Sequence, residues 1–166
     1  MVLNRFAPVL FALLMGTGIA FSQPSTTKKL ILLHTNDMHS RLNGFSPESD
    51  YSPLTENDDR TTGGFARLAA LISREKAQYG NQVLVLDAGD FLMGTFFSML
   101  EVNSGFQLRL MKKMGYDVVT LGNHEFDFGP RALATILERA EENGPVPLMV
   151  ASSLIFSEKD SADDAL

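Results

Sequence analysis

Four short apolar runs, each followed by polar residues, constrain the fold more than any other feature of this sequence. They are KLILLHT (29–35), QVLVLDAG (82–89), YDVVTLGN (116–123) and VPLMVAS (146–152). Runs that are apolar at nearly every position, rather than at alternate positions, are typical of strands buried on both faces, as in a parallel sheet. We therefore expect the four runs to form parallel strands.

Stretches with helical periodicity separate the expected strands. They cover residues 63–80, 104–115 and 129–144, and each ends at a glycine. In the second stretch Phe106, Leu110 and Met114 fall on one helical face, which we expect to pack on the core. Strand–helix alternation produces right-handed βαβ units. The expected fold is α/β, a mostly parallel sheet flanked and covered by helices.

The composition limits the classes of function. The chain has 166 residues, 45% of them hydrophobic, which indicates one globular domain or a piece of a larger one. Its net charge of -6 and the absence of a basic run argue against binding a nucleic-acid polymer. A small phosphate ester is not excluded, because bound metal ions can reverse a local field. With no cysteine, a metal would be held by imidazole, carboxylate, amide or water.

The N-terminus has the pattern of an export signal. Residues 1–22 contain Arg5, an apolar stretch and small residues before a cleavage point near Ser22-Gln23. The stretch is short for a spanning helix and contains Pro8, so an uncleaved anchor is the less favoured alternative and no stable membrane insertion is expected. We expect a signal peptide (1–22), a polar tether (23–29), and export to the periplasm or the medium.

Polar side chains follow three of the expected strands. Asp37 and His39 follow the first, Asp90 the second, and Asn123 and His124 the third. The carboxyl ends of parallel strands lie along one edge of a sheet, where ligands bind. If the chain stays extended after the first strand, Asp37 and His39 also point to the same side. The sequence therefore predicts that these residues converge.

This set of side chains suits a centre of two divalent cations. Two such ions about 3.5–4 Å apart need a bridging carboxylate, and together they clamp a phosphoryl group and activate water. Asp90, on the middle strand end, is the expected bridge, with Asp37 and His39 on one ion and Asn123 on the other. Nitrogen and oxygen ligands without sulfur allow Mn, Zn, Fe or Co and do not select among them.

Four ordered motifs carry a resemblance to a known family. LLHTNDMH, TGGFARLA, DAGDFLMGT and LGNHEFDFG are similar to motifs of the 5′-nucleotidase family, which includes UDP-sugar hydrolases and belongs to the binuclear metallophosphoesterases. The resemblance runs from about Leu30 to Ser153. It implies half of an α/β/β/α sandwich and metal-dependent hydrolysis of phosphate esters, with 5′-nucleotides or nucleotide sugars as substrates.

The resemblance also implies roles for single residues. Asp37 and His39 would bind the first metal, Asp90 would bridge, and Asn123 would bind the second. His124 would stabilise the transferring phosphoryl group, and Asp127 would orient His124. Arg67 matches the family's G-G-x-A-R string, and a role in supporting the site or in packing beside the sheet stays open. Glu125 is interpreted as structural or solvated.

The sequence departs from the family pattern downstream. The family carries further histidine motifs that complete both metal sites and a C-terminal domain that stacks the base, whereas all three histidines here precede residue 125. We therefore interpret residues 30–166 as a truncated N-terminal part of the catalytic domain, inactive alone. Alternatives are another branch of the fold, such as a cyclic-nucleotide phosphodiesterase or a thiosulfohydrolase, and a non-catalytic metal- or nucleotide-binding piece. The oligomeric state stays open.

Overall fold

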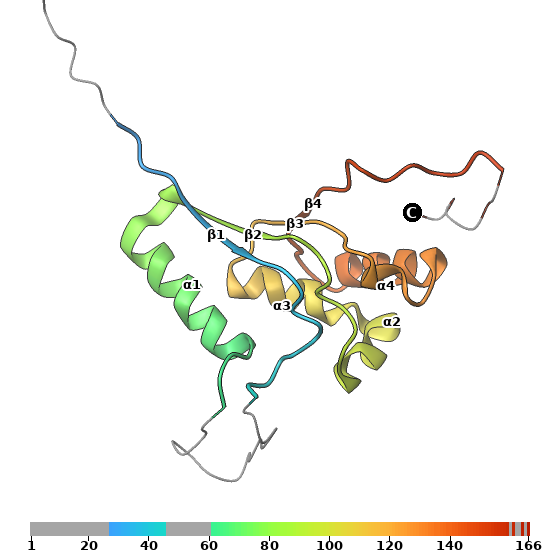
Figure 1. The fold of residues 1–166 in the computed structure, drawn as a ribbon, viewed down its shortest axis with the longest axis horizontal. Helices are drawn as coiled ribbons and strands as arrows, with labels where there is room; N and C mark the ends of the chain where they lie inside the picture. Colours follow the sequence, from blue (N-terminus) through green and yellow to red (C-terminus); the bar gives the residue numbers. More distant parts are fainter. Residues whose placement is uncertain (1–26, 46–60, 160, 162–163, 165) are drawn as a thin grey trace, which may run out of the picture.

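A four-stranded parallel sheet organises the chain (Figure 1). The computed structural model describes residues 27–45, 61–159, 161, 164 and 166, so the expected signal peptide lies outside the described residues. The strands, in spatial order, are β1 (Ile31–Thr35), β2 (Val83–Asp87), β3 (Val118–Val119) and β4 (Leu148–Met149). All three neighbouring pairs are parallel, as the apolar runs predict.

Helices occupy the connections between the strands. The longer ones are α1 (Phe65–Tyr79), α3 (Phe106–Met114) and α4 (Pro130–Glu142), with the short α2 (Glu101–Ser104) before α3 and 3₁₀ helices at η1 (Gly80–Gln82), η2 (Phe96–Leu100) and η3 (His124–Phe126). Pro130 starts α4, where its missing N–H costs nothing. The helices thus begin and end close to the positions that the sequence predicts.

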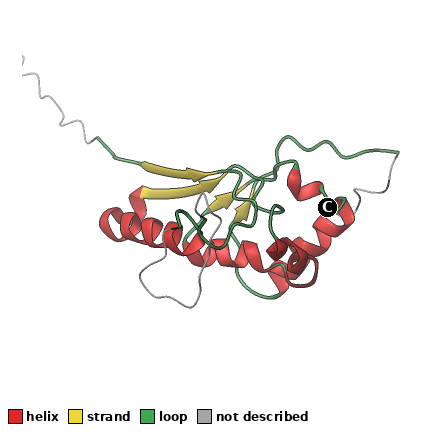
Figure 2. Cartoon of the chain, turned by 60° about the horizontal axis from the view of Figure 1, so that its bottom comes forward, coloured by secondary structure: helices red, strands yellow, loops and turns green. Residues whose placement is uncertain are grey.

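The helices cover one face of the sheet. Every crossover leads to the next strand in the same direction, and right-handed crossovers then place their helices on the same side. Figure 2 shows the strands above the row of longer helices. On the other face Leu32 is 56% exposed and His34 is exposed. The expectation of strands buried on both faces is therefore wrong for β1, whereas every position of β2 is buried or partly buried.

The core lies between the sheet and the helices. Val85, Met111, Tyr116 and Ile136 are among its fully buried side chains. On α3 the predicted face is partly right, because Met114 is buried and Leu110 packs against the core. The buried face also includes Leu108 and Met111, whereas Phe106 is only partly buried.

Gly105 forms a close contact at the corner that leads into α3. It has a φ of 53° between α2 and α3, and a Cβ added there would lie 2.4 Å from the backbone nitrogen of Ala140. The corner between α2 and α3 therefore packs directly on α4, at a position that requires glycine.

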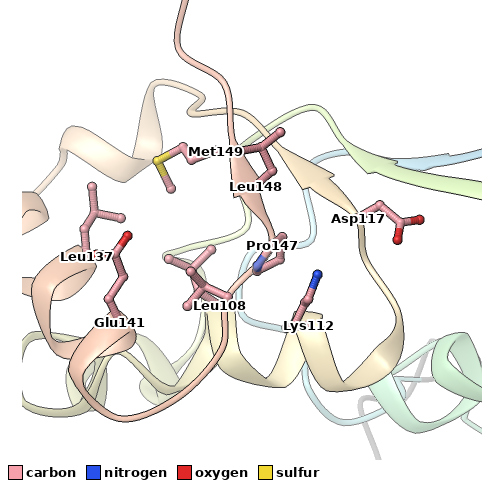
Figure 3. A pocket seen from close by; sticks show the side chains of 9 residues that line it. Leu108, Lys112, Asp117, Leu137, Glu141, Pro147, Leu148 and Met149 are labelled. Atoms are coloured by element: carbon pink, nitrogen blue, oxygen red, sulfur yellow. The ribbon is translucent and has the colours of Figure 1, made fainter.

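The strand β4 forms an edge of the sheet, with a cavity beside it. The cavity, of about 570 Å³, lies between β4 and helices α3 and α4 (Figure 3). Leu148 lines it and is 65% exposed. This edge lies at the far side of the sheet from β1. In the described ranges, no helix combines the length and the apolar character needed to cross a membrane.

A buried carboxylate stands at the start of α2. Glu101 is 1% exposed and accepts a hydrogen bond of 3.1 Å from the backbone N–H of Gln107. Burial raises the pKa of Glu101 to about 7, although the Gln107 bond and the charge of Arg109 act in the opposite direction. The corner between α2 and α3 therefore prefers a protonated Glu101.

We predict that Glu101→Gln removes part of the pH dependence of stability. The folded-state pKa of about 7 lies above the ordinary 4.5, so the stabilisation is complete below pH 4.5 and is lost as the pH rises through 7. At about 1.4 kcal/mol per pH unit, the gap between the two pKa values corresponds to at most roughly 3.5 kcal/mol of stability. Urea unfolding of the wild type and of Glu101→Gln at pH 5 and pH 8 would measure this pH-dependent stability. An equal loss of stability between the two pH values in both proteins would contradict the prediction.

Candidate metal centre

The parallel register of β1 and β2 brings their two following loops together. Thr35 pairs with Asp87 at the strand ends. Beyond them, the N–H of Asp37 donates to the carbonyl of Gly89 (3.0 Å), and the N–H of His39 donates to the carbonyl of Asp90 (3.0 Å). The loops therefore continue side by side past the sheet, and this pairing sets the spacing between their side chains.

The backbone after β1 is not extended as the sequence predicts. Asp37, His39 and Asp90 have φ values of 54°, 47° and 57°, in the left-handed region that residues other than glycine seldom adopt. Asp37 and His39 still converge, but a left-handed turn produces this result instead of the alternation of a strand. Strained backbone of this kind concentrates at functional sites.

Three side chains form a cluster that can hold a metal ion. Each of the three residues offers one ligand atom, and the ligand atoms of Asp37, His39 and Asp90 all lie within 4.8 Å of one another. Nε2 of His39 is 3.6 Å from Oδ1 of Asp37, and the Asp37 side chain is 56% exposed. Two carboxylates and an imidazole are a donor set that first-row divalent cations accept. The chemistry of the cluster therefore fits a divalent metal ion.

The loop after β3 completes the wall of this cluster. Oδ1 of Asp90 accepts the backbone N–H of His124 at 2.8 Å. A Cβ on Gly122 would lie 2.3 Å from the same oxygen, so only glycine permits this approach. The rings of His39 and His124 meet edge to face, with centroids 4.9 Å apart. Three strand ends that are distant in sequence therefore share one site.

His124 forms a close pair with Asp127. Its Nδ1 lies 2.7 Å from Oδ2 of Asp127, and the two side chains are 40% and 37% exposed. The hydrogen bond with Asp127 is the main cause that raises the pKa of His124, and the charges of Asp127, Asp90 and Glu125 act in the same direction. The pair thus favours an imidazolium whose Nε2 is directed away from Asp127.

Asn123 and Arg67 are placed less directly. Asn123 is exposed in the β3 loop, one residue before His124, and its role as a ligand stays a prediction. Arg67 donates hydrogen bonds to the hydroxyl of Thr61 (3.1 Å) and to the carbonyl of Gly63 (2.9 Å). These contacts hold the chain where it enters α1, and the choice between supporting the site and packing beside the sheet stays a prediction.

Asp87 has a role that was not predicted from the sequence. This carboxylate is 3% exposed, accepts the hydroxyl of Thr35 at 2.5 Å and the N–H of Gly89 at 3.0 Å, and so fixes the turn that leads to Asp90. Burial raises its pKa to about 6. A signal was present, because an Asp two residues before a glycine often accepts the N–H at that spacing.

Glu125 is the second residue whose role was not predicted. It is 0% exposed, so the structural interpretation is right and the solvated one is wrong. Its carboxylate accepts backbone N–H groups from Asp90, Leu92 and Gly122. Only the bond to Gly122 is local, and reaching back three residues to an N–H resembles the geometry of a capping box. The two bonds from Asp90 and Leu92 of the β2 loop join segments more than thirty residues apart, so no local sequence pattern predicts them.

Comparisons with known proteins agree with this geometry. The chain is 40% identical over 119 residues to 5′-nucleotidase of Bos taurus, covering 71% of this chain and 20% of the relative. The structure resembles a Haemophilus influenzae NAD nucleotidase (33% identity, TM-score 0.53, 66% of this chain and 19% of that one). It also resembles a 5′-nucleotidase precursor from Thermus thermophilus (36% identity, TM-score 0.51, 67% and 20%).

The extent of these matches bears on what the chain represents. The chain spans about a fifth of the length of the curated relatives it matches. The sequence model of a family described as Calcineurin-like phosphoesterase matches residues 30–155, which contain every residue of the site discussed above. By this match, the chain belongs to the calcineurin-like phosphoesterase family.

Proposed function

We propose that the protein hydrolyses phosphate esters with the help of two divalent metal ions, and that 5′-nucleotides or nucleotide sugars are its substrates. The observation that carries the proposal is the cluster of Asp37, His39 and Asp90 beside the His124–Asp127 pair. The family and the 5′-nucleotidase relatives support the same chemistry. The substrate class rests on the names of these relatives.

The ligands divide between two ions in this proposal. Asp37 and His39 hold the first, Asp90 is shared, and Asn123 contributes an amide oxygen to the second. Such ions, when bound, neutralise charge on the phosphoryl group and lower the pKa of water. Mn, Zn, Fe and Co all suit the donor set. Asp90 could contact both ions because its carboxylate has two oxygens, and its backbone N–H is held by Glu125 of the neighbouring loop.

His124 acts on the substrate in this proposal. Asp127 holds Nδ1, so that a proton on Nε2 can be donated to a phosphoryl oxygen as charge develops there. The raised pKa of His124 favours this protonated form. Asp127 is thus a positioning residue, which fixes the ring without touching the substrate.

We further propose that residues 30–166 form the N-terminal part of a larger catalytic domain. The uncovered face of the sheet, where Leu32 is 56% exposed, suits a second sheet of the expected sandwich. The span of about a fifth of the relatives supports the same view. Export through residues 1–22 is part of the proposal, and the Thermus thermophilus neighbour is likewise described as a precursor.

A fusion enzyme tests the proposed function. Residues 30–155 would replace the matching segment of the Thermus thermophilus 5′-nucleotidase precursor, and phosphate release from AMP with Mn²⁺ would be measured. We expect hydrolysis that Asp90→Asn abolishes with little loss of fold, because Asn tolerates the φ of 57° and still accepts from His124. Asp117→Asn, a carboxylate on the opposite end of β3 that pairs with Lys76, is the matched control.

Two results would count against this proposal. Full activity of the Asp90→Asn fusion with two bound ions would show that Asp90 is not the shared ligand. Turnover of about 1 s⁻¹ or more by the unfused chain, which is the ordinary enzymatic scale, would show that the chain needs no further ligands. We expect the unfused chain to release little or no phosphate.

Variants of two adjacent residues separate metal binding from catalysis. In the fusion, Asn123→Ala should reduce the metal content because it removes a ligand oxygen. His124→Ala should keep the metals and lower kcat by roughly 10²–10⁴-fold, the range of a general acid–base group. Metal analysis beside phosphate release measures both effects. Loss of metals from the His124 variant would mean that the roles are wrongly divided.

The carboxylate of Asp127 should control the protonation of His124. Asp127→Asn replaces the acceptor that raises the pKa of His124, so this pKa should fall. The imidazole signals of the metal-free chain, followed by NMR over pH, report the change directly, and His34, exposed on β1, is the internal reference. An unchanged titration of His124 would exclude the pairing in solution.

A further inference from the structure

Glu125 occupies an unusual position between two of the loops that build the metal site. It is fully buried in η3, and its two oxygens receive three backbone N–H groups. Oε2 accepts from Asp90 (2.9 Å) and Gly122 (2.6 Å), and Oε1 accepts from Leu92 (2.9 Å). A carboxylate saturated by three N–H donors forms bonds about twice as strong as neutral ones. Glu125 therefore joins the β2 loop to the β3 loop.

The backbone that Glu125 holds is strained. Asp90 has a φ of 57°, in the left-handed region that residues other than glycine seldom adopt. The neighbouring Gly89 lies so close to Gly122 that an added Cβ would be 2.4 Å from the nitrogen of Gly122. Such a conformation persists only where surrounding contacts fix it. The bond from the N–H of Asp90 to Glu125 is one of these contacts.

We infer that Glu125 is a positioning residue that holds Asp90 in its ligand geometry without touching metal or substrate. The inference rests on the proposed function, because it takes Asp90 as a metal ligand. A displacement of one ångström at a catalytic group can cost about 10²-fold in rate. The three bonds of Glu125, together with the bond from His124 N–H to Asp90, restrict such movement.

The geometry explains why no similar side chain can replace Glu125. In Gln, one carboxylate oxygen becomes an NH₂ group, which would face either the paired N–H donors of Asp90 and Gly122 or that of Leu92. In Asp, the charge remains but the side chain is one C–C bond of about 1.5 Å shorter. Positioning therefore requires both the charge and the length of Glu125.

Metal affinity of the fusion enzyme described above tests the inference with a readout other than activity. Mn²⁺ binding, followed by EPR, should weaken by roughly 10–100-fold in both Glu125→Gln and Glu125→Asp, as for other groups that support a ligand. Glu101→Gln is the matched control, because Glu101 is an equally buried carboxylate that also accepts a backbone N–H but lies outside the site. Its Mn²⁺ affinity should equal that of the wild type.

The outcomes separate the inference from the proposed function. Failure of the wild-type fusion to bind Mn²⁺ would overturn the metal function, and the inference with it. Wild-type affinity in Glu125→Gln would overturn only the inference. If Glu125→Asp bound Mn²⁺ as tightly as the wild type while Glu125→Gln bound it weakly, the charge at position 125 would matter but its exact placement would not. This result would also overturn the inference.

Hydrogen exchange of the wild type covers the case in which the Glu125 variants do not fold. Coupling is reciprocal, so if Glu125 prepares the site for metal, metal must strengthen the bonds of Glu125. Adding Zn²⁺ should slow exchange of the Leu92 and Gly122 amides, measured by NMR, more than that of the Gln107 amide bonded to Glu101. Equal effects on these amides would overturn the inference.

Discussion

The parallel pairing of β1 with β2 is the constraint on which the site depends. Its register places Thr35 beside Asp87, where the two side chains also share a short hydrogen bond. From that point the backbones of the two loops stay paired for several residues beyond the sheet. A shift of one residue would turn the strand faces over and separate the loop partners. The ligand cluster is thus an extension of the sheet ladder, and its rigidity comes from the core below it.

The sequence predicts the architecture well because the architecture depends on local patterns. Apolar runs and helical spacing are properties of neighbouring residues, so the parallel order and the helix ends follow from them. The convergence of Asp37, His39 and Asp90 also follows, since parallel strands end at one edge of a sheet. These are features in which local preference and the global fold agree.

The features that the sequence does not predict arise from contacts between distant segments. The left-handed backbone of Asp37 and His39 is imposed by pairing with the β2 loop. The corner before α3 packs on α4 at Gly105, a contact between segments that are distant in the sequence. The exposed face of the sheet is also not predicted by the sequence. An apolar residue such as Leu32 indicates that a strand can be covered, but it does not indicate which segment covers it.

The left-handed backbone at the three clustered residues also has a consequence for how this site can change over time. Glycine at position 37, 39 or 90 would adopt the left-handed backbone without steric strain, but it would delete the side chain that can bind a metal. At these positions, substitutions that relieve backbone strain and the side chains that can bind a metal therefore exclude each other.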